Sequence, residues 1–137
     1  MKITQEVDYA LRVVLYLSKL GYGNKIEAKV ISHQENIPLR FLLKLLRKLK
    51  QASIIDSFRG VTGGYALAKL PKDITLKDVV EAIDGPIYVN RCLYDPSLCN
   101  LNRTNHCEMH KTLNRVQQKL LYELEDINFE DIIKDNK

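Results

Sequence analysis

The sequence predicts a mainly α-helical protein with one short β-hairpin near the middle of the chain. Three observations lead to this prediction. Apolar residues recur at steps of three and four along most of the 137 residues, which is the period of helices packed on a core. The alternation typical of strands occurs in two short runs separated by a glycine-rich segment, residues 60–64. Glycine or proline marks the ends of several helical runs, at Gly21, Pro38 and Gly85.

The first helix is expected to begin at Thr4, a favourable N-cap, with Glu6 and Asp8 in its first turn and a stop at Gly21. Two apolar stripes cover most of its circumference. A helix of this kind is buried on more than one face, which in so small a chain suggests a dimer. The stripes consist of Val7, Ala10, Leu11, Val14 and Leu17 on one side, and Tyr9, Val13, Tyr16 and Leu20 on the other.

Two further helices and a hairpin follow. Residues 26–33 predict a short helix, residues 35–37 a turn, and Pro38 opens a third helix at a position where proline is tolerated. This third helix has an apolar stripe and a basic side. Residues 54–58 and 65–68 then predict a β-hairpin. Two helices joined by a tight turn and followed by a hairpin are the pattern of a winged helix-turn-helix.

The second half of the chain is organised differently. A helix begins at Thr75 and ends at Gly85, and residues 85–105 show no sustained period and are expected to form a loop. From about Cys107 a long helix resumes, whose apolar spacing suits packing on another helix across a two-fold axis. We therefore expect three parts: a DNA-binding domain over residues 1–84, a sensor loop over 85–110, and a dimerisation helix and tail over 111–137.

Charge is distributed unevenly along the chain. Between Pro38 and Gly60 there are six basic residues and one acidic residue, although the formal net charge of the whole chain is only +4. A basic first half predicts a polyanionic partner. Charged residues, among them Glu6, Asp8 and Arg12, interrupt the first apolar run, so we expect neither a signal peptide nor a membrane span, and a cytoplasmic protein.

The basic helix and the hairpin predict binding to double-stranded DNA. Residues near the start of a recognition helix can reach base edges in the major groove, whereas those further along meet phosphates. An arginine at a hairpin tip can enter the minor groove. The other interpretation is a solvated helix face beside a hairpin that only covers a core. The expected DNA-binding residues are Pro38, Arg40, Lys44, Arg47, Lys48, Arg59 and Gly60.

All three cysteines, Cys92, Cys99 and Cys107, lie in the predicted loop or at its end, and His110 follows one helical turn later. An odd number of cysteines in an intracellular chain favours metal or redox use over a disulfide framework. Three interpretations fit these residues: a tetrahedral zinc site, an iron–sulfur cluster, and a metal-free thiol pair that oxidises. The wide spacing between the cysteines suits an object larger than one zinc ion. No catalytic triad, phosphate loop or nucleotide-binding motif is present, so we do not expect an enzyme.

Four stretches resemble the Rrf2 family of bacterial winged-helix regulators, which includes the iron–sulfur sensors IscR and NsrR. They are residues 1–4 (MKIT) and 8–12 (DYALR) in the first helix, 37–42 (IPLRFL) at the start of the third, and 59–65 (RGVTGGY) in the hairpin. The cysteines fall where the family binds its cluster. The resemblance covers nearly the whole chain.

The resemblance implies a homodimer, paired through the long C-terminal helix, that binds a near-palindromic operator with an affinity set by an iron–sulfur cluster. Cys92, Cys99 and Cys107 are implied ligands. His110 would complete a [2Fe–2S] cluster as in IscR, which is narrowly favoured; Asp8 from the partner subunit would complete a [4Fe–4S] cluster as in NsrR-like proteins. The expected function is therefore transcriptional regulation responding to cluster status, redox state or nitric oxide. A zinc-stabilised or thiol-redox interaction module without a cluster is the alternative.

Overall fold

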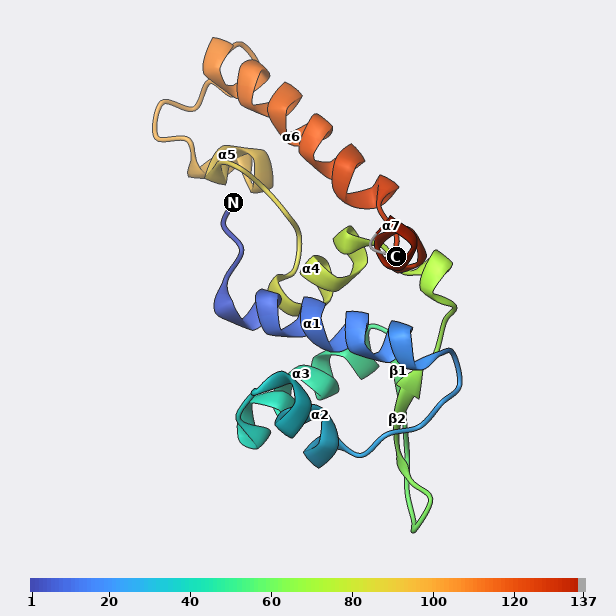
Figure 1. Cartoon of the computed structure of the whole chain (residues 1–137). Coiled ribbons are helices and arrows are strands. Elements are labelled where there is room, and N and C mark those ends of the chain that lie inside the picture. The colour runs from blue at the N-terminus through green and yellow to red at the C-terminus, as the bar shows by residue number, and fades with distance from the viewer. Residues whose placement is uncertain (136–137) are drawn as a thin grey trace.

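The computed structural model describes residues 1–135 and shows a mainly helical protein with one two-stranded antiparallel sheet (Figure 1). This confirms the predicted fold class. The last two residues of the predicted dimerisation helix and tail, 136–137, lie outside the described residues. In chain order the elements are α1 (Gln5–Leu20), α2 (Ala28–Glu35), α3 (Leu39–Gln51), β1 (Ile55–Phe58), β2 (Gly64–Leu67), the 3-10 helix η1 (Pro71–Asp73), α4 (Leu76–Asp84), α5 (Arg91–Tyr94), the 3-10 helix η2 (Pro96–Leu98), α6 (Glu108–Asp126) and α7 (Phe129–Asp135).

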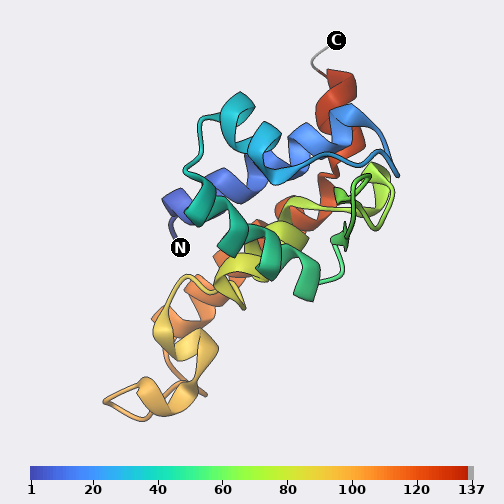
Figure 2. The same cartoon turned by 90° about the horizontal axis from the view of Figure 1, so that it is seen from below.

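Helix α1 is the centre of the fold, and α2, α3, α4 and α7 all contact it (Figures 1 and 2). It begins at Thr4, whose hydroxyl accepts a hydrogen bond from the backbone N–H of Val7 at 3.2 Å. Helix α1 is buried on several sides, as expected, and the elements that cover it belong to the same chain. The fully buried apolar residues of α1 are Val7, Ala10, Val13, Val14 and Leu17.

Helices α2 and α3 and the hairpin form the predicted winged helix-turn-helix. Helix α2 ends at Asn36, whose left-handed backbone (φ 53°) reverses the chain before α3. In the wing, Ile55 pairs with Leu67 and Phe58 with Gly64. Helix α2 starts two residues later than predicted, because the N–H and C=O of Ile26 pair with Tyr65 at 3.0 and 2.8 Å instead of starting a helix. The segment before α2 is thereby attached to the wing.

The C-terminal half departs from the sequence prediction in two places. Residues 85–105 include two short helical elements, α5 and η2, because Asn90 and Asp95 cap them with their side chains. The C-terminal stretch is also two helices instead of one helix and a tail. The chain turns after α6, and Phe129, 1% exposed, enters the core. The Phe129 N–H binds the Ile74 carbonyl at 3.1 Å, which ties α7 to the segment before α4.

Helix α6 extends away from the helical core together with α5 and the sensor loop (Figure 1). Its only buried residue is polar, Gln117, whereas Met109 and Val116 are exposed. These two residues are one heptad apart and lie on the same side of the helix. Within residues 1–135, no helix is long and apolar enough to cross a membrane.

Candidate functional site

Helix α3 presents a basic face on the side opposite its buried leucines. Leu42, Leu45, Leu46 and Leu49 are completely buried. None of the five basic residues of the helix is buried; they are Arg40, Lys44, Arg47, Lys48 and Lys50. The helix starts directly after Pro38, which occupies the N-cap position. Exposed on the outer side are Arg40, Lys44 and Arg47.

Lys48 occupies a different environment from the other predicted DNA contacts. Its ammonium lies 2.7 Å from the Glu6 carboxylate on α1 and 3.4 Å from the Ile83 carbonyl in the last turn of α4. The role predicted for Lys48 at a phosphate stays a prediction. In this structure Lys48 joins three helices, a contact that its position in α3 alone does not reveal.

The wing tip is shaped by glycines. A hydrogen bond of 3.0 Å from the Gly63 N–H to the Gly60 carbonyl closes the turn, and Gly60 has a φ of +98°. A Cβ at Gly63 would lie 2.4 Å from the Phe58 carbonyl oxygen, so no other residue fits without a shift. Arg59 is exposed beside this turn and Val61 is fully exposed at its tip. The turn therefore holds the Arg59 backbone at the end of a tightly closed wing.

The four predicted cluster ligands come together. Cys92 in α5, Cys99 after η2, Cys107 at the N-cap of α6 and His110 in the first turn of α6 line one pocket of about 240 Å³. All four are partly buried. Cys92 Sγ lies 3.1 Å from His110 Nδ1. Residues 18 positions apart in the sequence are thus in direct contact.

The donor chemistry of this pocket fits an iron–sulfur cluster, since three thiols and one imidazole are ligands that such clusters use. Among residues 1–135, no group of three or more His, Cys, Asp or Glu side chains is arranged so that it could hold a metal ion. Ligation therefore requires the pocket-lining segments to draw together. Hydrogen bonds from the backbone N–H groups of Arg103 and Leu101 lower the pKa of the Cys99 thiol and so favour its thiolate form.

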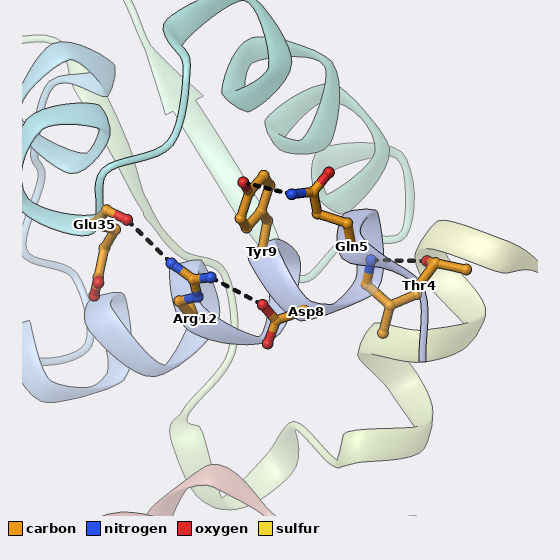
Figure 3. A network of polar contacts seen from close by, with 7 residues as sticks. Thr4, Gln5, Asp8, Tyr9, Arg12 and Glu35 are labelled. Atoms are coloured by element: carbon orange, nitrogen blue, oxygen red, sulfur yellow. Dashed lines mark hydrogen bonds and ion pairs between the residues drawn. The ribbon is translucent and has the colours of Figure 1, made fainter. Parts of the chain in front are cut away.

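Asp8, the other predicted fourth ligand, lies on α1 and is not part of this pocket. Its carboxylate pairs with Arg12 at 2.9 Å, and the Arg12 guanidinium also donates to the Glu35 carbonyl at the end of α2, at 3.2 Å (Figure 3). The Arg12 guanidinium carbon lies 4.9 Å from the centre of the Tyr9 ring, and the Tyr9 hydroxyl accepts a hydrogen bond from Gln5 (Figure 3). Arg12 contacts one carboxylate oxygen of Asp8, Oδ2.

The structure adds one positioning residue, Gln117, to those expected from the sequence. The Gln117 side-chain oxygen accepts a hydrogen bond of 2.8 Å from the backbone N–H of Val89, and so fixes the start of the sensor loop to α6. A polar residue within an apolar helical stripe is the signal that points to such a bond.

Comparison with known proteins identifies the family. Residues 3–135 match the Rrf2 family model, described as an iron-dependent transcriptional regulator. An rrf2-like helix-turn-helix regulator of Rhodobacter capsulatus is 32% identical over 139 residues, which cover 96% of this chain and 91% of that protein.

Two solved structures share the fold. IscR of T. potens has a TM-score of 0.78 and 20% identity, and the match covers 100% of this chain and 89% of that one. CymR, described as the global cysteine regulator of B. subtilis, has a TM-score of 0.71 and 27% identity, covering 96% and 95%. The members of this family regulate transcription and are not enzymes. The chain belongs to the Rrf2 family of transcriptional regulators.

Proposed function

We propose that this protein is a homodimeric regulator whose affinity for a near-palindromic DNA operator is controlled by an iron–sulfur cluster held in the sensor loop. The observation that carries the proposal is the convergence of Cys92, Cys99, Cys107 and His110 on one pocket. This pocket belongs to a segment that starts where α4 ends, and α4 packs on the recognition helix α3. The proposed division is a DNA-binding domain over 1–84, called the reading domain below, a sensor loop over 85–110 and a dimerisation region from 111 onward.

DNA recognition is assigned to α3 and the wing. Arg40 and Lys44, near the start of α3, face base edges in the major groove, and Arg47 meets a phosphate. Pro38 sets the start of the helix, and Gly60 allows the wing backbone to approach the duplex. Arg59 enters the minor groove, where narrow A·T tracts attract guanidinium groups.

Dimerisation is assigned to the uncovered side of α6. Met109, Leu113, Val116 and Leu120 follow steps of four, three and four, which is the spacing of a helix-pairing seam. Met109 and Val116 are 62% and 48% exposed, so half of this seam has no cover within the chain. A two-fold pairing here would present the two α3 helices to successive major grooves, which on B-DNA lie about 34–36 Å apart.

The sensor pocket supplies the cluster ligands. Cys92, Cys99 and Cys107 provide thiolates, and His110, already in contact with Cys92, is the favoured fourth ligand. A bound [2Fe–2S] cluster supplies a centre that responds to redox state and nitric oxide. The partner subunit's Asp8 with a [4Fe–4S] cluster remains the second possibility. Zinc or a thiol pair would give an interaction module without a cluster.

Helix α4 connects the pocket to the recognition helix. Drawing Cys92 toward Cys99 and Cys107 pulls on the segment that starts at Gly85. The Ile83 carbonyl, two residues earlier, contacts the Lys48 ammonium of α3. A displacement at the end of α4 therefore moves α3 through the contact with Lys48. In a dimer, a small rotation of each subunit changes the distance between the two α3 helices.

The DNA assignment is tested by fluorescence anisotropy with a labelled promoter duplex. Arg40→Ala and Arg59→Ala should each weaken binding by about 1–3 kcal/mol, or roughly 5- to 150-fold, if these arginines contact bases. Lys72→Ala, which removes an exposed charge outside α3 and the wing, is the matched control. Unchanged affinity in both arginine variants would show that the groove assignments are wrong.

The fourth ligand is tested by measuring iron in anaerobically purified variants. His110→Ala should lower the iron content and Asp8→Ala should leave it unchanged. The reverse result would assign the site to Asp8 of the partner subunit. If both variants keep full iron, another group completes the site.

A further inference from the structure

Two lysines outside the predicted set lie on opposite faces of the wing. We propose that Lys25 and Lys50 bind phosphates on the two walls of the minor groove that the wing enters. This inference rests on the proposed DNA-binding function and extends it from the wing tip to both sides of the wing. It assigns a binding role to the segment before α2, which lies outside the helix-turn-helix and the hairpin.

Lys25 is held on the outer face of the wing by an aromatic ring. Its ammonium lies 4.3 Å from the centre of the Phe58 ring, and both side chains are exposed. The next residue, Ile26, exchanges two backbone hydrogen bonds with Tyr65 of β2. A Cβ at Gly64 would lie 2.5 Å from the Ile26 carbonyl oxygen, so the glycine is what allows this close approach. The position of Lys25 is therefore fixed relative to the wing by the backbone pairing of its neighbour Ile26.

Lys50 lies on the other face. It is exposed in the last turn of α3, and its ammonium donates a hydrogen bond of 2.7 Å to the Ser57 hydroxyl on β1. Successive side chains of a strand point to opposite faces. Ile55 is buried against the core, so Ser57 shares its inner face and Phe58 lies on the outer face. The two lysines are thus held against adjacent residues on the two sides of β1.

Both ammonium groups are available for an anion. In the described part of the chain neither lysine forms an ion pair. The one acidic residue of the strand, Asp56, shares the outer face with Phe58 and is exposed. The minor groove is about 6 Å wide, so a hairpin that enters it faces a sugar–phosphate wall on each side. A cation on each face of the wing matches that arrangement.

The test is the salt dependence of binding to a labelled duplex of mixed sequence, measured from about 50 to 200 mM salt. Each phosphate contact that is lost should reduce the slope of log K against log salt by about 0.9 per bound chain. Lys25→Gln and Lys50→Gln should each show this reduction, and the double variant about twice as much. Lys134→Gln, which removes one exposed charge on α7, should leave the slope unchanged.

Two variants separate charge from position. Lys25→Arg should keep the wild-type slope because it keeps the charge. Phe58→Leu should keep the slope but weaken binding by about two- to five-fold, since the ring no longer holds the ammonium in place. Thermal unfolding of each variant checks that the wing is intact.

The outcomes distinguish this inference from the proposed function. If Arg59→Gln reduces the slope but Lys25→Gln and Lys50→Gln do not, the wing binds DNA and the phosphate assignment is overturned. If the wild-type protein binds no duplex at all, the proposed DNA-binding function fails, and the assignment fails with it.

Discussion

Two regions of this protein differ in how much apolar surface they bury: the reading domain, residues 1–84, and the sensor region, residues 85–126, which comprises the sensor loop and α6. In residues 1–84 the helices bury many aliphatic side chains completely, with Leu42, Leu45 and Leu46 of α3 all at 0% exposure. In residues 85–126 only Ile87 and Gln117 are buried. Leu101 and Met109, both 62% exposed, show how little of this region is covered.

The difference indicates that the two regions obtain their order from different sources. Burial of apolar surface is the main stabilising contribution to a fold, and the reading domain obtains it from its own residues. The sensor region has little of that contribution; instead, three thiols and an imidazole line a pocket there, and one side of α6 is uncovered. A region of this kind is completed by what binds to it. Helix α3 is therefore preformed, and under the proposed function its position relative to a second copy is the quantity that cluster binding would change.

The largest contrast is expected in stability. Leu45→Ala should lower the free energy of unfolding by about 2–5 kcal/mol, because it leaves a cavity in the core. Leu101→Ala in the sensor loop should change it by less than about 0.5 kcal/mol. Urea unfolding followed by circular dichroism measures both. Equal effects would mean that the sensor region is as tightly packed as the reading domain.

The uncovered side of α6 gives the next largest effect. Val116→Lys places a charge in the proposed seam and should convert the proposed dimer to a monomer, whereas Lys111→Gln on the same helix should leave it dimeric. Sedimentation velocity at micromolar concentration distinguishes the two states. A dimer that survives Val116→Lys would move the subunit interface away from this side of α6.

The contacts of Lys48 with α1 and with the end of α4, where the sensor loop begins, should show a smaller effect. Glu6→Gln removes the ionic partner of Lys48, and because that pair is partly exposed the expected loss of stability is about 1 kcal/mol. Asp8→Asn removes the more exposed pair with Arg12 and should cost less than about 0.5 kcal/mol. Amide hydrogen exchange shows where in the chain each variant loses protection. Faster exchange at the end of α4 in Glu6→Gln, but not in Asp8→Asn, supports the contact through Lys48, and identical exchange contradicts it.

The smallest effect concerns the thiol of Cys99, which is partly buried. Its lowered pKa favours the thiolate, so alkylation by iodoacetamide should persist at a lower pH than for an ordinary cysteine. The rate is measured against pH in a variant with serine at positions 92 and 107. Unfolding in urea removes the backbone donors of Arg103 and Leu101 and should return the apparent pKa to its usual range. The same profile with and without urea would contradict the assignment.

Local patterns were sufficient to predict the first and third helices and the hairpin. The apolar steps of α1 and α3, the proline before α3 and the glycines of the wing act within a few residues, so their structural consequences are visible in the sequence. Contacts between distant segments were not predictable in this way. The Ile26–Tyr65 pairing that delays the start of α2, and the docking of Phe129 that separates α7 from α6, depend on the completed fold.

The candidate site was predictable as a set of residues but not as an arrangement. The clustering of Cys92, Cys99 and Cys107 in one segment indicated joint use, and the structure places them with His110 around one pocket. Their spacing could not reveal the Cys92–His110 contact or the engagement of Asp8 by Arg12. The partners of Lys25 and Lys48 were equally hidden, because both lysines are held by residues from other elements.

The central claim is that the sensor pocket is completed by an iron–sulfur cluster. It is tested most directly by the iron and acid-labile sulfide content of protein purified without exposure to air. The account predicts iron and sulfide in equal amounts, with visible absorption that bleaches in air or nitric oxide, and the loss of both in Cys92→Ser. A colourless protein that contains stoichiometric zinc and no iron would contradict it.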